Sequence, residues 1–116
     1  MDKICTDVEQ SKKLIEEGIN VNTADMFWEY DHNTHTFNDV PKVLAVKNWD
    51  DPYNKNLPAW SLSALLGLMP TFTLNGYGNG QFNCRDERAD CYALLDTCPL
   101  DVAFEMVVWL KEKDKL

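Results

Sequence analysis

The centre of the chain reads Leu57-Pro58-Ala59-Trp60-Ser61-Leu62-Ser63-Ala64-Leu65-Leu66-Gly67-Leu68-Met69-Pro70. From Asn56 to Cys84 the sequence contains no Asp, Glu, Lys, Arg or His, so the formal charge lies toward the two ends of the protein. Buried charge is costly unless it is paired, and a charge-free block of this kind therefore belongs mainly to an interior. The central segment predicts a hydrophobic core rather than a reaction site.

Signals for the start and the end of a helix lie within this segment. Ser61 is suited to cap a helix over residues 62–69, because its hydroxyl can accept a hydrogen bond from a backbone N–H in the first turn. Trp60, directly before the cap, is placed to pack on Leu65 as a hydrophobic staple. Pro70 cannot continue the helix and ends it. We therefore predict a short, buried central helix.

Another helix is predicted near the N-terminus, over residues 7–17. Thr6 followed by Glu9 has the pattern of a capping box, in which two side chains satisfy backbone N–H groups at the helix start. Gly18 suits the left-handed conformation that often follows the last turn. The expected core stripe of this helix consists of Val8, Ser11, Leu14 and Ile15.

Two strands are expected between these helices. Residues 26–30 carry large side chains at alternate positions, which is typical of a strand. Residues 31–35 follow as a turn. A second strand is predicted over residues 43–47. Pro41 has no N–H to donate to a neighbouring strand, so this strand either starts after Pro41 or lies at the edge of the sheet.

The C-terminal part predicts a three-stranded meander and a last helix. Strands over residues 71–77 and 81–85 are joined at Asn79-Gly80, a pair typical of the type I′ hairpin turn, and a third strand covers residues 91–95. Pro99 is favourable in the first turn of the helix that follows. Its expected core stripe consists of Leu100, Ala103, Phe104, Val107 and Leu110.

The predicted order of elements is α-β-β-α-β-β-β-α. Strands clustered between helices, without regular βαβ alternation, indicate the α+β class. We expect one domain over residues 1–116, in which an antiparallel sheet of four to five strands packs against two to three helices.

The charge balance limits the classes of partner. The chain has 11 basic and 19 acidic residues and a net charge of −8. Nucleic acids and anionic lipids are bound by clustered Lys and Arg, so we expect neither direct nucleic-acid binding nor membrane binding. The longest apolar run, Leu57 to Met69, is too short to span a bilayer, and the first residues lack the apolar stretch of a signal peptide. We therefore expect a cytoplasmic protein.

No cofactor or metal motif stands out among the cysteines and glycines. Reduced thiols are expected in the cytoplasm, and Cys5, Cys84, Cys91 and Cys98 form no Cys-x-x-Cys pair, so we expect structural thiols. The segment Gly76-Tyr77-Gly78-Asn79-Gly80 matches neither the dinucleotide-binding nor the P-loop pattern, and a hairpin turn accounts for its composition.

The nearest approach to a metal-binding cluster is the loop Asp31-His32-Asn33-Thr34-His35 with Asp39 after it. His32 and His35 have ligand-type side chains, and Asp31 or Asp39 can add an oxygen ligand. A helical His-Glu-x-x-His context is missing, so we interpret the cluster as an exposed loop. It remains the basis for an alternative hypothesis, a small metal-dependent hydrolase.

An aromatic pair in the loop before the central helix indicates a recognition surface. Trp49 and Tyr53 flank Asp50, Asp51 and a proline in a polar segment. Tyr and Trp supply much contact area with little loss of entropy and are enriched where proteins bind one another. We predict that Trp49, Asp50, Asp51 and Tyr53 form a partner-binding surface.

Two segments are distinctive as a pair. These are Pro58-Ala59-Trp60-Ser61-Leu62-Ser63-Ala64-Leu65-Leu66 and Asp101-Val102-Ala103-Phe104-Glu105-Met106-Val107-Val108-Trp109-Leu110. Together they resemble small uncharacterised proteins of gut Bacteroidetes, their phages and integrated mobile elements. The resemblance extends from Pro58 to Leu110 and implies a genomic setting, without any catalytic residue.

These observations favour a protein-binding accessory or regulatory factor, of phage or mobile-element origin, over an enzyme. Two alternatives stay open. The first is an acidic mimic of nucleic acid that inhibits a nucleic-acid-binding protein, because −8 on a small domain can imitate a row of phosphates. The second is the metal-dependent hydrolase that uses the His32 and His35 cluster.

Overall fold

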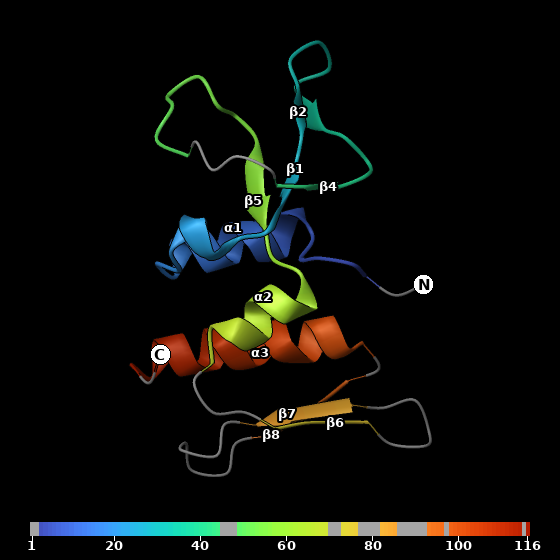
Figure 1. Cartoon of the computed structure of the whole chain (residues 1–116), viewed down its shortest axis with the longest axis vertical. Helices are drawn as coiled ribbons and strands as arrows, with labels where there is room; N and C mark the ends of the chain where they lie inside the picture. Colours follow the sequence, from blue (N-terminus) through green and yellow to red (C-terminus); the bar gives the residue numbers. More distant parts are fainter. Residues whose placement is uncertain are drawn as a thin grey trace.

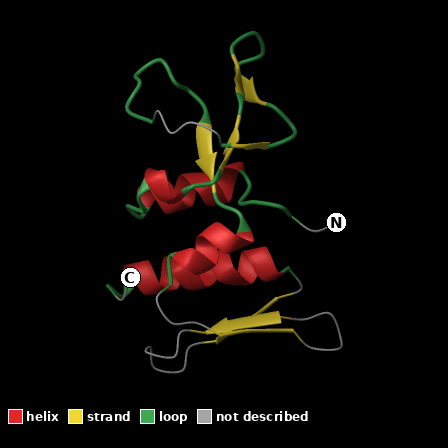
Figure 2. Cartoon of the chain, in the orientation of Figure 1, coloured by secondary structure: helices red, strands yellow, loops and turns green. Residues whose placement is uncertain are grey.

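In the described part of the computed structural model of the chain, three α-helices lie between two small antiparallel sheets (Figure 1). The structure describes residues 3–44, 49–69, 73–76, 82–85, 93–96, 98–114 and 116. One sheet packs on α1 (Val8–Glu16), the other packs on α3 (Pro99–Glu112), and α2 (Leu62–Gly67) contacts α3. Figure 2 shows the resulting layers, with strands at both ends of the long axis and helices between them.

Short strands make up both sheets. The first sheet has the order β4-β1-β5 and consists of β1 (Met26–Trp28), β4 (Lys42–Val43) and β5 (Leu57–Ala59). The second has the order β6-β7-β8 and consists of β6 (Thr73–Gly76), β7 (Phe82–Arg85) and β8 (Ala93–Asp96). A separate hairpin joins β2 (Tyr30–Asp31) to β3 (Thr36–Phe37), and a short 3₁₀ helix, η1 (Val21–Thr23), precedes β1.

Side-chain caps fix the starts of α1 and α2. Asp7 Oδ1 accepts a hydrogen bond from the Gln10 N–H at 2.8 Å, and Gln10 Oε1 accepts one from the Asp7 N–H at 3.1 Å. The expected capping box of Thr6 and Glu9 was therefore wrong by one residue at each position. The Thr6 hydroxyl accepts instead from the Trp60 N–H and contacts the hydroxyl of Ser11, so it is committed to tertiary contacts.

The prediction for the central helix is confirmed at its start. Ser61 Oγ accepts a hydrogen bond from the Ala64 N–H at 3.2 Å, and Trp60 and Leu65 are fully buried in the same core. Helix α2 ends at Gly67, two positions before the predicted end. Pro70 lies outside the described residues.

The main core joins all three helices and the second sheet. Its buried side chains include Leu14 of α1, Leu65 of α2, Met106 of α3 and Cys84 of β7. A smaller cluster under the first sheet contains Cys5, Met26 and Ala59, with Trp28 packed against it. The prediction that the central segment supplies core is confirmed, because Ala59, Trp60, Leu65 and Met69 are all buried.

Two predicted core stripes are only partly right. In α3, Leu100, Ala103, Val107 and Leu110 are buried, whereas Phe104 is half-buried. In α1, Ser11 and Leu14 are buried, whereas Ile15 is 37% exposed. Gly18 has a φ of +88°, which confirms its expected left-handed conformation after the helix.

The α+β class is confirmed, whereas the strands are arranged differently from the prediction. The expected single sheet of four to five strands is replaced by two three-stranded sheets on opposite sides of the helices and a hairpin (Figure 1). Strand β5, which pairs its Pro58 with Phe27, had not been expected, and the strand expected over residues 26–30 is interrupted at Glu29.

Two other strand predictions are tested only in part. The strand expected over residues 43–47 begins at Lys42, and it is an edge strand as Pro41 indicated. Residues 45–48 lie outside the described residues, as does the predicted turn at Asn79-Gly80. The flanking strands β6 and β7 are antiparallel, with Gly76 opposite Phe82.

Candidate functional site

The loop predicted as a partner surface presents its tyrosine to solvent. Asp51 Oδ1 accepts a hydrogen bond from the Tyr53 N–H at 2.9 Å, and the Asp51 carbonyl accepts from the Asn54 N–H at 3.0 Å, so the backbone forms a closed turn. Tyr53 is 86% exposed. Asp50 and Asp51 are exposed as well, and they supply charge beside the ring.

Trp49 differs from Tyr53 in its surroundings. Its side chain is half-buried, and its indole Nε1 is buried without a hydrogen-bond partner among the residues that the structure describes. A buried, unpaired donor is costly, so the ring is held there by packing. The four residues predicted as one surface therefore divide into an exposed part, Asp50 to Tyr53, and an anchored part, Trp49.

The histidines lie on the β2–β3 hairpin and contact Tyr30. Its ring meets that of His32 edge-on with 5.1 Å between centroids, and its hydroxyl lies 3.3 Å from His35 Nδ1. The Asp31 carboxylate accepts from the Asn33 N–H at 2.8 Å, which closes the turn. These contacts give the cluster a structural role as a hairpin tip.

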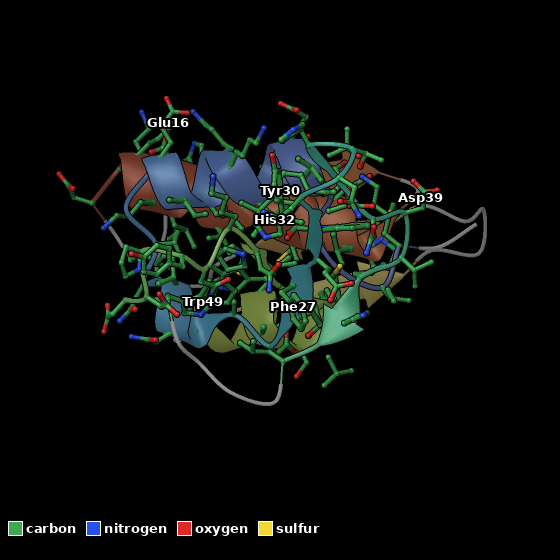
Figure 3. All side chains as sticks on the ribbon, turned by 90° about the horizontal axis from the view of Figure 1, so that it is seen from above. Glu16, Phe27, Tyr30, His32, Asp39 and Trp49 are labelled. Carbon is green, nitrogen blue, oxygen red and sulfur yellow. The ribbon has the colours of Figure 1, made fainter. Side chains whose placement is uncertain are left out.

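No metal site is assembled from these residues. Among the residues that the structure describes, no group of three or more His, Cys, Asp or Glu side chains is placed to hold a metal ion. Figure 3 shows His32 beside Tyr30 at the middle of the molecule, Asp39 at the right and Trp49 at the left. The four side chains of the hydrolase hypothesis are thus not brought together, because Asp39 belongs to a different site.

Asp39 lines a pocket of about 390 Å³ between the N-terminal segment, β1 and the segment before β4. We call this the N-terminal pocket. Its apolar walls are Ile4, Trp28, Val40 and Pro41, its thiol is Cys5, and its charged side chains are Lys3, Asp7 and Asp39. Predominantly apolar walls with a few polar groups are typical of a binding site.

Hydrogen bonds hold the wall of this pocket in place. The Trp28 indole N–H donates to the Thr6 carbonyl at 2.9 Å, which fixes the ring beside the N-terminal segment. Cys5 is 3% exposed and packs with Met26 and Ala59. Burial raises the pKa of the Cys5 thiol to about 11, with a further contribution from the nearby carboxylate of Asp25. A thiol with this pKa is protonated near neutral pH and is a poor nucleophile.

The charged side chains at the pocket differ in how they are paired. Lys3 Nζ lies 3.1 Å from Asp7 Oδ2 and 2.9 Å from Asp101 Oδ1. Burial lowers the pKa of Lys3, but the hydrogen bonds to Asp101 and Asp7 outweigh burial and raise it above its ordinary value. Asp39, by contrast, has neither an ion pair nor a hydrogen bond within the described part of the chain.

Exposed aliphatic side chains extend the pocket across the surface. Ile4 is 61% exposed and Val40 is 69% exposed, and both line the pocket. Val43 is 76% exposed and lies opposite Met26 in the β1–β4 register. Paired residues of an antiparallel sheet point to the same face, and Trp28 shares that face with Met26, so Val43 continues the same apolar surface.

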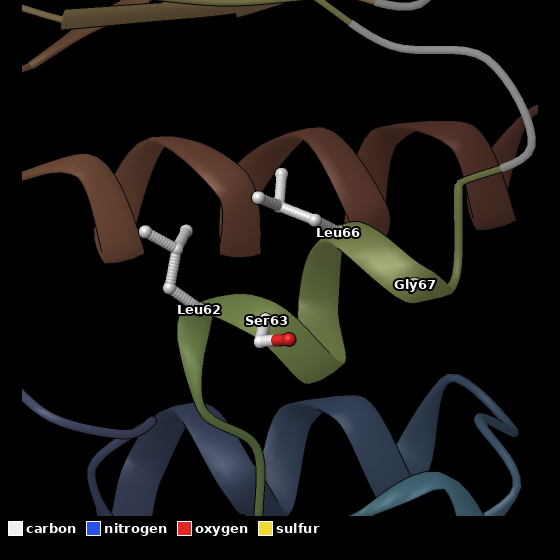
Figure 4. Close-up of a pocket in the computed structure, with 4 residues that line it drawn as sticks. All are labelled: Leu62, Ser63, Leu66 and Gly67. Atoms are coloured by element: carbon white, nitrogen blue, oxygen red, sulfur yellow. The ribbon is translucent and has the colours of Figure 1, made fainter.

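A second hollow, of about 480 Å³, lies along α2 and carries little chemistry. It is lined by Leu62, Ser63, Leu66 and Gly67. Figure 4 shows the Leu62 and Leu66 side chains directed toward α3, which agrees with their packing against the main core. Among its described lining residues, one serine hydroxyl is the only polar side chain, so the hollow has few means of selecting a ligand.

Comparisons with known proteins give no indication of the function of this chain, so the function is argued from the pocket and the exposed side chains alone. No protein-family model matches the chain, and neither the curated proteins nor the solved structures include a significant match. Within the described ranges, no helix has both the length and the apolar character needed to cross a bilayer.

The sequence does not indicate three of the pocket residues as part of a binding surface. Its pattern indicates Asp39 only as a metal ligand, and it indicates no role for Ile4 or Val40. Isolated aliphatic residues in polar segments carry no periodicity, so pattern analysis does not detect them. The available signal was their occurrence outside any predicted strand or helix, where no core position accounts for a large apolar side chain.

Proposed function

We propose that this protein acts by binding another protein in the cytoplasm, and that the N-terminal pocket with Ile4, Val40 and Val43 is the surface that binds. The observation that carries this proposal is the exposure of these three aliphatic side chains beside a pocket walled by Trp28. Contiguous exposed apolar surface marks interaction sites in small proteins, because its burial in a complex is favourable.

Binding is favoured over catalysis by the chemistry of the pocket. Its thiol has a pKa near 11, and none of its described lining residues is a histidine that could act as a base toward that thiol. Of its two carboxylates, Asp7 is engaged as the cap of α1 and by Lys3, which leaves Asp39 as a single carboxylate without an acid–base partner among the described lining residues. The resemblance to proteins of phages and mobile elements supports an accessory or regulatory role for such a binding protein.

The acidic-mimic alternative receives less support from the carboxylates. A mimic needs free carboxylates at phosphate-like spacing, whereas many of those described are engaged within the fold. Lysine ion pairs hold Asp7, Glu17, Glu29, Asp101 and Glu112, and hydrogen bonds from backbone N–H or hydroxyl groups hold Asp25, Asp31 and Asp51.

Affinity capture from the native host with matched variants tests the proposal. Val40→Asp places a charge in the exposed apolar surface without touching the core, so it is expected to abolish capture of the wild-type partner. Ile15→Asp is the control, because Ile15 is also an exposed aliphatic residue but lies on α1 outside the pocket. Capture that survives Val40→Asp contradicts the proposed surface, and so does equal loss of capture with Val40→Asp and Ile15→Asp.

A further inference from the structure

We infer that the N-terminal pocket binds a segment of a partner protein in which an aliphatic or aromatic side chain stands next to Lys or Arg. This inference rests on the proposed function and specifies the chemistry of the partner. It follows from the apolar walls of the pocket and from the way its charges are paired.

The apolar part of the ligand is defined by the walls. Ile4 and Val40 are 61% and 69% exposed, so covering them removes apolar area from water. The Trp28 indole N–H is already satisfied by the Thr6 carbonyl at 2.9 Å. An apolar side chain can therefore lie on the ring without leaving that donor unpaired. An anchor of this kind in a preformed pocket is what dominates the affinity of protein interfaces.

The cationic part of the ligand is defined by Asp39. The one lysine of the pocket is already held by Asp7 and Asp101, which leaves Asp39 without a counter-charge among the described residues. The whole chain carries a net charge of −8. An approaching Lys or Arg is therefore attracted both by the Asp39 carboxylate and by the net charge of the chain, whereas an acidic segment is repelled. The same net charge opposes a second copy of this chain as the occupant.

Peptide titration of the purified full chain tests the inference. Three peptides share one length and neutral flanks: the first has a central Leu between two Lys, the second has Leu between two Glu, and the third has Ser between two Lys. Binding is measured by NMR as shifts of the assigned amide signals of Ile4 and Val40. The first peptide is expected to shift both signals and to bind at least about fivefold more tightly than the other two.

Two charge variants separate a local effect from the net charge. Asp39→Asn is expected to weaken binding of the first peptide by about two- to fivefold, which corresponds to the loss of one partly exposed ion pair. Glu16→Gln is the matched control, because it removes the same charge from an exposed carboxylate on α1, well away from Asp39 in Figure 3. It is expected to leave the affinity unchanged.

The inference is overturned by any of three results. These are equal binding of the Glu-flanked peptide, equal weakening by both charge variants, and the absence of shifts at Ile4 and Val40 with every peptide. In each case the proposed function is judged separately by the capture experiment. If Val40→Asp abolishes capture of the partner, the proposed binding surface is upheld and only the basic-apolar ligand is rejected. If the partner is still captured with Val40→Asp, the proposed surface itself is rejected.

Discussion

Thr6 and Trp60, 54 positions apart in the sequence, exchange two hydrogen bonds. The Thr6 N–H donates to the Trp60 carbonyl at 2.8 Å, and the Trp60 N–H donates to Thr6 Oγ1 at 3.0 Å. Thr6 immediately precedes the cap of α1, and Trp60 immediately precedes the cap of α2. The Thr6 carbonyl also accepts from the Trp28 indole, so this one residue ties two helix starts to the wall of the N-terminal pocket.

Replacing Thr6 by Val tests this junction. The side chain keeps its shape but loses the hydroxyl, which leaves the buried Trp60 N–H without its acceptor and leaves the Ser11 hydroxyl with only its long bond to the Thr6 carbonyl, at 3.5 Å. The free energy of unfolding is expected to fall by about 1–3 kcal/mol in urea melts. Thr34→Val, on the exposed hairpin, is the control and is expected to change it by less than about 0.5 kcal/mol. Equal effects of the two substitutions would refute the importance of the junction.

The central helix offers a test of the main core. Leu65 is fully buried among α1 and α3 side chains, so Leu65→Ala is expected to lower the free energy of unfolding by about 2–5 kcal/mol through loss of contacts and formation of a cavity. Leu62→Ala, at a partly buried position of the same helix, should cost less. A loss at Leu65 well below about 1 kcal/mol would mean that the core had been misplaced.

The aromatic loop can be separated into its two parts. Tyr53 is 86% exposed, so Tyr53→Ala is expected to leave stability unchanged, whereas Trp49→Ala should lower it because the ring is half-buried. Thermal melts of both variants measure the difference. In affinity capture, Tyr53→Ala should retain the partner if the N-terminal pocket is the binding surface. Loss of the partner with this variant would move the surface to the loop predicted from sequence.

The pairing of Lys3 and Asp101 predicts a pH dependence. Burial raises the pKa of Asp101, but hydrogen bonds from Lys3 and Gln10 outweigh burial and lower it below its ordinary value of 3.8. The stability that comes from this lowered pKa is present above pH 3.8 and is lost as the pH falls through the folded-state value. The pKa of Lys3 is raised above 10.5, so its contribution is present below that pH and is lost as the pH rises through the folded-state value.

Asp101→Asn measures this contribution. Between pH 3.8 and pH 10.5 the variant is expected to be less stable than the wild type. The difference is expected to be about 1 kcal/mol or less, because the Lys3 and Asp101 side chains are partly exposed and their attraction is screened by solvent. The difference should shrink toward both pH extremes. Glu9→Gln, at an exposed carboxylate on the first turn of α1, is the control. A difference for Asp101→Asn that stays constant from acid to alkaline pH would contradict the ion pair.

Features that depend on nearby residues were predictable from the sequence. Ser61 as a cap, Gly18 as the residue after α1 and Pro99 at the start of α3 each depend on a few neighbours along the chain, and each is confirmed. The cap of α1 was misplaced by one position because Thr6 and Asp7 are both good cap residues. The choice between them is made by Trp60, whose N–H takes the Thr6 hydroxyl as its acceptor.

Features that depend on distant segments were not predictable. Strand β5 was missed because Pro58 argues against a strand, yet its position at a sheet edge makes the missing N–H tolerable opposite Phe27. The N-terminal pocket was missed for a related reason. It forms where Ile4, Trp28 and Val40 converge from three separate segments. The pairing of β1 with β4 brings the Val40 segment toward Trp28, and the hydrogen bonds of Thr6 with Trp60 and Trp28 hold the Ile4 segment there.

Site-specific photocrosslinking in the native host tests the proposed binding surface most directly. A benzophenone side chain takes the place of Val40 in one variant and of Ile15 in a control, and ultraviolet light joins it to whatever protein lies within a few ångströms. We predict one discrete crosslinked partner from position 40, absent from position 15 and lost when Ile4→Asp is added. Crosslinking from position 15 alone, or crosslinking from position 40 that is indifferent to Ile4→Asp, would contradict binding at the N-terminal pocket.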